Sequence, residues 1–206
     1  MYTKILFASL STFLASNVVF ANNFYIGADI GAIALQNKLS LLEGVFDGGA
    51  FGFVGGGFGG YTYNVTNQWN LGLEGFIDGT AVTINDVVHA GPTVASTTIK
   101  DRYNGGVRLL PGYQFLKRVE GHVLVGYVRG NFNFSDTDHH LNTNFAANGF
   151  QFGLGSSIGV FDNFSVRGDM IYNGYQSHTI LASSGDAHKS QPSSLAGTVS
   201  AVYSFD

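Results

Sequence analysis

The stretch SLAGTVSAVYSFD, residues 194–206, alternates along its length between two kinds of side chain. Successive side chains of a β-strand point to opposite faces of a sheet, so a period of two predicts a strand with one apolar face. The apolar face holds Leu195, Gly197, Val199, Ala201, Tyr203 and Phe205, and the opposite face holds Ala196, Thr198, Ser200 and Ser204. What covers the apolar face decides the fold.

The composition of the chain is too apolar for a protein surrounded by water. Charged residues make up 12% of its 206 residues, whereas about a quarter is usual in soluble domains. After the first 21 residues, there is no apolar run of about 18 residues that could form a membrane helix. A closed β-barrel is the other structure that pairs all backbone polar groups within lipid. The formal net charge of -4 argues against a nucleic-acid partner.

The N-terminus predicts export from the cytoplasm. A base at Lys4 precedes an apolar run over 5–14, and the sequence VFA at 19–21 offers small or modest residues to a signal peptidase. We expect a signal peptide at 1–21 and a single barrel domain at 22–206. The chain has no cysteine, so it has no disulfide framework.

Eight segments repeat the two-residue alternation. They cover 24–33, 50–63, 69–79, 102–115, 119–130, 149–161, 164–175 and 193–205. Short connections alternate along the chain with the long predicted loops 34–49, 80–101, 131–148 and 176–193. This arrangement predicts an all-β fold, a transmembrane antiparallel up-and-down barrel of about eight strands with short periplasmic turns and long extracellular loops. Pro111 cannot donate to a strand ladder and predicts a bulge or a frayed strand end.

The alternation also assigns side chains to the two faces of the barrel. Residues expected to face lipid include Leu71, Leu73, Ile77, Val166, Met170 and Tyr172. An aromatic girdle is expected near the short turns, formed by Tyr61, Tyr63, Trp69, Tyr113, Phe115, Phe161, Phe164, Tyr203 and Phe205.

The interior of an eight-stranded barrel is just wide enough for side chains to fill it. Buried charges are costly unless they are paired. We therefore expect a luminal charge network, with a narrow charge-lined channel as the alternative. Its expected members are Asp29, Glu74, Asp78, Arg108, Glu120, His122, Arg167 and Asp169.

Four motifs complete this pattern, namely GYTY at 60–63, GLEGF at 72–76, GLGSSIGVFDNFSVRGDMIYNGY at 153–175 and YSF at 203–205. With the signal peptide and the eight segments, they make the chain resemble the opacity-protein and OmpA/OmpX-type eight-stranded outer-membrane barrels of Gram-negative bacteria. The resemblance implies a C-terminal signal read by the barrel-assembly machinery. Its positions correspond to Thr198, Ser200, Tyr203 and Phe205. Ser200 stands where glycine is usual, and Asp206 extends past the terminal Phe.

The resemblance implies a non-enzymatic outer-membrane protein without catalytic residues, metal site or cofactor. Its loops would serve adhesion, host interaction or envelope integrity. The implied partners are outer-membrane lipid and lipopolysaccharide, the barrel-assembly machinery, and a host or surface ligand bound by the loops.

Two alternatives remain at this point. One is a narrow porin-like channel for small solutes or ions. The other is a lipid A deacylase, because HKS at 188–190 is similar to the His-x-Ser pair of that family. The pair falls in a predicted loop beside Pro192, where a nucleophile and its base would lack rigid positioning.

Overall fold

The computed structural model describes residues 24–41, 44–90, 93–136, 141–181 and 187–205. The predicted signal peptide at 1–21 and Asp206 lie outside the described residues. Within these ranges no helix is long and apolar enough to cross a membrane.

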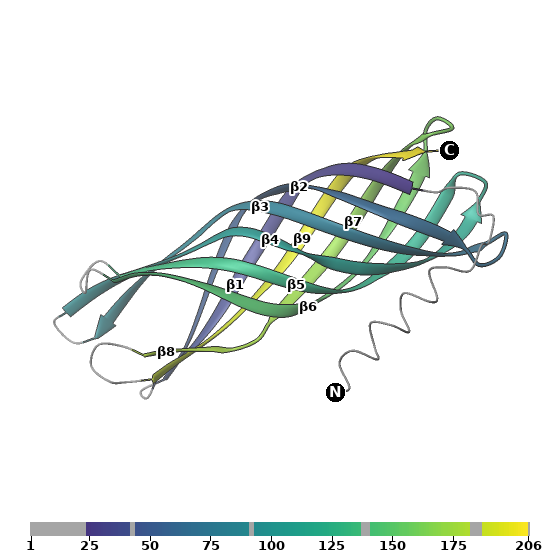
Figure 1. Cartoon of the computed structure of the whole chain (residues 1–206). Coiled ribbons are helices and arrows are strands. Elements are labelled where there is room, and N and C mark those ends of the chain that lie inside the picture. Colours follow the sequence, from purple (N-terminus) through teal and green to yellow (C-terminus); the bar gives the residue numbers. More distant parts are fainter. Residues whose placement is uncertain (1–23, 42–43, 91–92, 137–140, 182–186, 206) are drawn as a thin grey trace, which may run out of the picture.

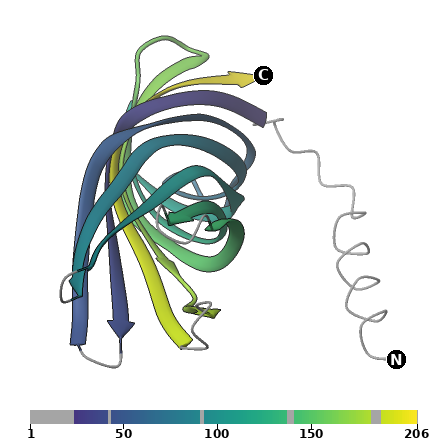
Figure 2. The same cartoon turned by 90° about the vertical axis from the view of Figure 1, so that its left-hand side faces the viewer.

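The described chain forms one antiparallel sheet that closes on itself (Figures 1 and 2). Each strand pairs with the next, and the first pairs with the last. The strands are β1 Phe24–Leu41, β2 Gly44–Asn64, β3 Trp69–Ala90, β4 Thr93–Leu116, β5 Val119–Asp136, β6 Leu141–Gly159, β7 Phe164–Tyr175, β8 His178–Leu181 and β9 Ala187–Phe205. Short β8 pairs with β9 beyond the end of β7, so eight strands make the wall, as the alternation predicts.

The pairing register sets the geometry of the barrel. A row of paired residues starts at Tyr25, crosses every strand of the wall and returns to β1 ten residues further on, at Leu35. This stagger is the shear of the barrel, and it accompanies a strand tilt of roughly 35–45°. The first row, as we call it, runs through Tyr25, Gly60, Glu74, Arg108, Gly126, Gln151, Asn173 and Ser194.

The two ends of the barrel differ. The turn end carries the short connections after β2, β4 and β6, together with Phe24 and Phe205, and lies at the right of Figure 1. The hairpin end carries the other connections. In outer-membrane barrels the short turns face the periplasm and the long connections face outward, so the hairpin end is the external one.

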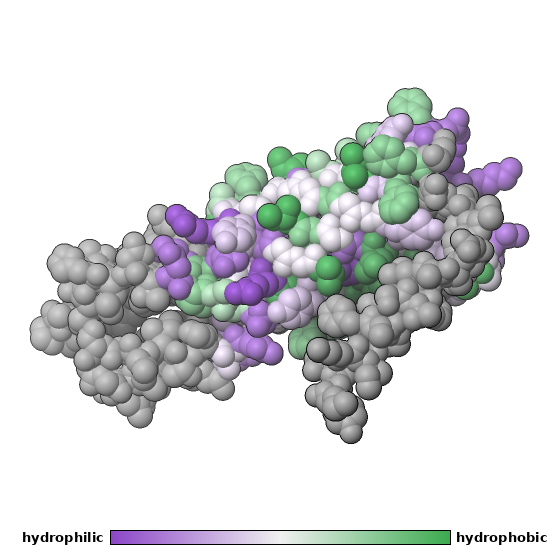
Figure 3. Space-filling view, in the orientation of Figure 1, coloured by the Kyte–Doolittle hydropathy of each residue, from purple (hydrophilic) through white to green (hydrophobic). Residues whose placement is uncertain are grey.

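The outer face of the wall is apolar, as the alternation predicts. Ile77 and Met170 are 63% and 56% exposed, and Val199 is 58% exposed. Figure 3 shows apolar side chains spread over the middle of the visible wall. At the turn end the aromatic rings predicted to form a girdle touch one another, with Trp69 and Tyr113 4.9 Å apart between centroids. Lipid therefore covers the apolar face that the terminal strand presents.

The predicted loops are largely wrong, because the strands continue through them. Pairing of β3 with β4 extends to Ala90 and Thr93, and pairing of β1 with β2 extends to Leu41 and Gly44. Beyond the membrane no lipid selects apolar side chains on one face, so the alternation fades while backbone pairing goes on. Side-chain periodicity therefore marked only the membrane-spanning part of each strand.

Residues 188–190 also lie in a strand and not in the predicted loop. They belong to β9, where Ser190 pairs with Leu39 of β1 and with His178 of β8. Pro192 is accommodated because β9 pairs with β1 continuously there, while its pairing with β7 and β8 is interrupted. A missing backbone N–H costs little at such an interruption.

The bulge predicted at Pro111 is absent from the described strand. Pro111 lies inside β4 and pairs with Leu71 of β3. On the β5 side the pairs Leu109–Val125 and Gly112–His122 keep the same register across the proline. The ladder is interrupted at Pro111 without a shift, which is what the loss of one N–H donor requires.

Candidate functional site

Glu74 of β3 is the centre of the polar lumen. Its side chain is buried, and its Oε2 accepts hydrogen bonds from Tyr25 Oη at 3.1 Å and from Arg167 Nη1 at 2.7 Å. Its Oε1 accepts a hydrogen bond from the Arg108 guanidinium. One buried carboxylate thus compensates two buried guanidinium groups, a geometry in which every charged group has a partner.

From Arg108 a chain of contacts continues along the first row. Arg108 Nη1 lies 3.5 Å from Gln151 Oε1, and Gln151 Nε2 donates to Asn173 Oδ1 at 3.0 Å. Asn173 Nδ2 then donates to Ser194 Oγ at 3.1 Å. Residues paired across a sheet place their side chains side by side, so one row of the register joins polar groups from six strands.

Glycines in the first row make room for these contacts. A Cβ atom at Gly60 would lie 2.6 Å from Tyr25 Oη, and one at Gly126 would lie 2.7 Å from Arg108 Cβ. Tyr25 and Arg108 can therefore reach across a whole strand to their partners. The abundance of glycine in this sequence has a packing reason at these two positions.

Arg167 joins a second cluster to Glu74. Its Nε lies 2.8 Å from Asp169 Oδ2, an ion pair without hydrogen-bond geometry, and Asp169 Oδ1 lies 2.8 Å from His122 Nε2. Gly155, paired with both His122 and Asp169, leaves the space in which they meet. We call the connected set the luminal network: Tyr25, Glu74, Arg108, His122, Arg167 and Asp169.

Aromatic rings enclose the two guanidinium groups. Arg167 Cζ lies 4.1 Å from the centroid of the Phe58 ring, and Arg108 Cζ lies 4.8 Å from that of Phe76. Cations over aromatic faces gain electrostatic energy, more so when both are desolvated. The phenylalanines of β2 and β3 thus support the charges as well as filling space.

Three of the eight charged residues expected in the lumen stay outside the luminal network. Glu120 is half-buried near the turn end and accepts a hydrogen bond from Asn70 Nδ2 at 2.8 Å. Asp29 and Asp78 are half-buried closer to the hairpin end than Glu74 is, and each has a buried Oδ1 atom without a hydrogen-bond partner. The other five charged residues, Glu74, Arg108, His122, Arg167 and Asp169, all belong to the luminal network.

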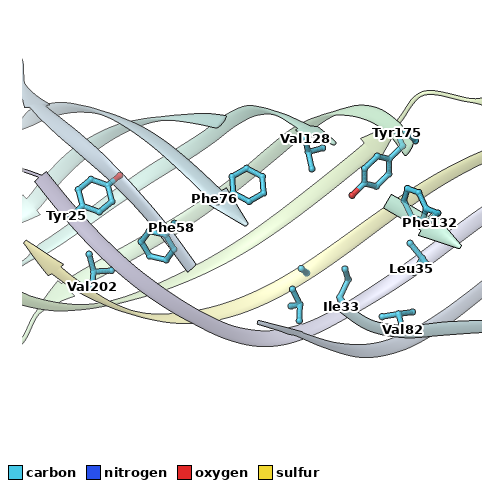
Figure 4. Close-up of a cluster of buried hydrophobic side chains, with 13 residues drawn as sticks. Tyr25, Ile33, Leu35, Phe58, Phe76, Val82, Val128, Phe132, Tyr175 and Val202 are labelled. Atoms are coloured by element: carbon cyan, nitrogen blue, oxygen red, sulfur yellow. The ribbon is translucent and has the colours of Figure 1, made fainter. Parts of the chain in front are cut away.

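The lumen changes character along the barrel axis. At the turn end a cavity of about 130 Å³ is lined mainly by polar residues, among them Asn70, Glu120 and His122. Towards the hairpin end the interior is apolar, and the rings of Phe132 and Tyr175 meet edge to face at 5.2 Å. This apolar plug, drawn at the right of Figure 4, comprises Ile33, Leu35, Val82, Val128, Phe132 and Tyr175, all at most 3% exposed.

Comparison with known proteins assigns this architecture to a family. A family model described as the outer membrane protein beta-barrel domain matches residues 5–205. The chain belongs to this family. The match covers nearly the whole length, and it agrees with a closed eight-stranded wall whose outer face is apolar. Membership places the protein in the outer membrane of the cell.

Individual relatives of this outer-membrane barrel are distant. It is 28% identical over 137 residues to the 31 kDa outer-membrane immunogenic protein of Brucella melitensis, covering 64% of this chain and 57% of the relative. The chain therefore spans little more than half the length of that protein.

Two solved barrels share its fold. The outer membrane protease OmpT from Escherichia coli is 9% identical with a TM-score of 0.52, and the match covers 92% of this chain and 99% of OmpT. The outer membrane protein OprG from Pseudomonas aeruginosa is 12% identical with a TM-score of 0.51, and the match covers 90% of this chain and 96% of OprG.

Several functional side chains of this outer-membrane barrel were missed in the sequence. Tyr25 shares the strand and the luminal face of Asp29, a signal that could have revealed it. Gln151 stands in a segment dominated by glycine and phenylalanine, and its role depends on neighbours in β5 and β7. Tyr175 Oη donates to Asn104 Oδ1 at 3.0 Å across the barrel, a contact between residues 71 positions apart. No local sequence pattern predicts such a pair.

Proposed function

We propose that this protein is a non-enzymatic surface-contact protein of the outer membrane, acting through the hairpins at its external end in adhesion or host interaction. The observation that carries the proposal is the way the wall opens above the membrane. Pairing between β2 and β3 ends at Phe53 and Ala81, and pairing between β6 and β7 ends at Gly149 and Tyr175. Strands β2, β3 and β6 continue well beyond these pairs, whereas β7 ends at Tyr175.

Two sheets therefore rise from the barrel. One contains β8, β9, β1 and β2, and the other contains β3, β4, β5 and β6. A spanning strand needs about 9–11 residues, whereas β3 has 22 and β4 has 24. Within the described strands, the backbone of β2 above Phe53 has no neighbour in β3. An open strand edge is a template for a further strand, and extended peptides bind in this way.

The apolar plug argues against the porin-like alternative. Its side chains come from four strands, β1, β3, β5 and β7, and pack in the lumen towards the hairpin end. Water and ions would have to displace close-packed rings to pass.

We expect the folded protein to give no steady single-channel current in a planar lipid bilayer, because the apolar plug leaves no continuous polar path. Folding would first be checked by comparing the gel migration of boiled and unboiled samples. Steady openings whose conductance changes when Arg108 is replaced by glutamine would contradict this prediction and support the channel.

The relative from Brucella supports exposure at the surface, since it is named as an immunogenic protein. The C-terminal strand supports the proposed assembly signal. The rings of Tyr203 and Phe205 lie on the outer face 5.1 Å apart, where the assembly machinery and lipid could meet them, while Thr198 and Ser200 point inward. Lipid and lipopolysaccharide would contact the same apolar outer face.

The surface-contact role can be tested by shortening one hairpin. Residues 84–99 of β3 and β4 would be replaced by Asn-Gly, which favours a two-residue hairpin turn. A non-adherent strain displaying the wild-type protein should bind cultured epithelial cells, and the shortened protein should lose that binding while it still folds. The matched control shortens β5 and β6 by replacing residues 134–143 in the same way.

Unchanged adhesion of both shortened proteins would contradict the proposal. If a strain lacking the protein becomes sensitive to detergent and the shortened forms restore its resistance, the role belongs to the barrel and is one of envelope integrity.

A further inference from the structure

Two exposed arginines lie on neighbouring strands towards the external end of the barrel. They are Arg102 of β4 and Arg129 of β5, and we call them the arginine pair. Of the other basic side chains that the structure describes, two are buried in the lumen and two belong to the short turn between β4 and β5. The arginine pair therefore needs an explanation other than the luminal network or the turn end.

The spacing along β4 places Arg102 at the level of lipid headgroups. Tyr113 belongs to the aromatic girdle at the turn end, and Tyr103 lies ten residues away on the same strand, towards the hairpin end. A spanning strand needs about 9–11 residues, and tyrosine is favoured where lipid meets water. Tyr103 therefore marks the external edge of the hydrocarbon region, and Arg102 is the next residue outward.

Strand β5 repeats this order of side chains. Val123, Val125 and Tyr127 follow one another on its outer face, and all three are exposed. Arg129 is the next outward residue, and it is exposed as well. On both strands an apolar run thus ends in a tyrosine and then an arginine, at the edge of the membrane.

A β-bulge turns Arg102 outward. The register between β4 and β5 shifts between Asp101 and Tyr103. Strict alternation from the buried Asn104 would direct Arg102 into the lumen, but the extra residue leaves Arg102 exposed beside the exposed Tyr103. Bulges re-aim side chains in this way. The bulge is what gives the outer face its second base.

The arginine pair is close enough to bind one headgroup. Arg129 pairs with Gly105 of β4, which is three residues from Arg102. With a strand spacing of about 4.8 Å and a rise of about 3.3 Å per residue, the two Cα atoms lie roughly 11 Å apart. Two arginine side chains can converge across this span on one phosphate, or each can hold one phosphate of a disaccharide.

The protein supplies no counter-charge to the arginine pair. Among the side chains that the structure describes, neither arginine takes part in an ion pair, and the acidic ones lie in the lumen or at the turn end. Like charges on neighbouring strands destabilise a sheet, so an anion bound between them is favoured. Guanidinium groups bind phosphate through two parallel hydrogen bonds.

We propose that the arginine pair, with Tyr103 and Tyr127, forms a binding site for the phosphorylated sugar headgroup of a glycolipid in the external leaflet, the chemistry that lipid A offers. The arginines bind the phosphates and the tyrosine rings lie at the level of the sugars. The acyl chains lie along the apolar outer face below. This site is separate from the hairpins that carry the proposed contact function, so either proposal can fail without the other.

Native mass spectrometry of the folded protein mixed with diphosphoryl lipid A in detergent micelles tests the site. The wild type should retain one lipid A molecule per chain. Arg102→Gln combined with Arg129→Gln should reduce retention by about tenfold or more, because one hydrogen bond between charged groups is worth about that factor. Lys117→Gln removes an exposed base at the turn end. This matched control should retain lipid A as the wild type does.

Two further lipids test the chemistry of the ligand. Lipid A without its phosphates should be retained at least tenfold less than diphosphoryl lipid A. Phosphatidylglycerol, which has a phosphate but no disaccharide, should also be retained at least tenfold less. Equal retention of either lipid by the wild type would overturn the assignment to a phosphorylated glycolipid.

A second readout confirms that the variants are folded. The temperature at which the compact gel band is lost should rise when the wild type is given diphosphoryl lipid A, because a ligand of the folded state stabilises it. The rise should be smaller for the double variant. Both arginines are exposed, so the double variant should still form the compact band. Equal retention of diphosphoryl lipid A by the wild type and the folded double variant would overturn the proposal.

Discussion

Replacing Glu74 by glutamine should destabilise the folded barrel by about 3–5 kcal/mol, the cost of removing one partner from a buried ion pair. Glu74 accepts hydrogen bonds from Arg108 and Arg167, which are 2% and 4% exposed. Glutamine keeps the size of the side chain but leaves Arg108 without a counter-charge and Arg167 with Asp169 alone. Urea unfolding in lipid vesicles would measure the loss.

The chain offers a convenient probe and a matched control for this experiment. Trp69 is the one tryptophan of the sequence and lies 54% exposed on the outer face at the turn end, so its fluorescence should report departure from lipid. Glu120→Gln removes a luminal acid that is half-buried and holds no arginine, and we expect a change of less than about 1 kcal/mol. Equal stability of the Glu74 and Glu120 variants would refute the central role of Glu74.

Replacing Gly31 by alanine should impair closure of the barrel. Gly31 of β1 pairs with Thr198 of β9 at the seam where the first and last strands meet. A Cβ atom there would lie 2.1 Å from the carbonyl oxygen of Gly197 and 2.8 Å from Thr198 Cα. Because these are backbone atoms, no side-chain rotation relieves the clash. Overpacking of this kind costs about 1–3 kcal/mol or more.

The matched control lies on the other strand of the same seam. A Cβ atom at Gly197 would meet nothing within 4 Å, since this position faces outward. Gly197→Ala should therefore fold with a stability within about 0.5 kcal/mol of the wild type. Refolding into detergent micelles, followed by the fraction of compact band on a gel, compares the two. Similar yields for both variants would show that the seam tolerates a side chain.

The membrane-spanning strands were predictable because two solvents act on them. Lipid on one side and a polar lumen on the other select side chains with a period of two, so Val199 and Met170 face outward as the alternation indicates. The strand extensions could not be predicted in this way. Between β3 and β4, pairing to Ala90 and Thr93 depends on backbone hydrogen bonds, which leave little trace in side-chain type.

The luminal network also combines features that the sequence predicts with features that it does not. Arg167 and Asp169 are two positions apart and share a strand face, so the sequence alone brings them to one side of the sheet. That Arg167 also reaches Glu74, 93 positions away, depends on the register of strands around the closed wall.

The sequence by itself determined a closed transmembrane barrel, the lipid-facing surface and the acids and bases available to the lumen. These follow from composition and local alternation, which each strand carries within its own residues. Only the tertiary structure decided which charges meet, where the apolar plug lies and where the wall divides into two sheets. Those outcomes depend on the stagger of ten residues from Tyr25 to Leu35. This stagger belongs to the closed sheet as a whole, because it is the sum of the pairings around the wall, including the closing pair of β1 with β9.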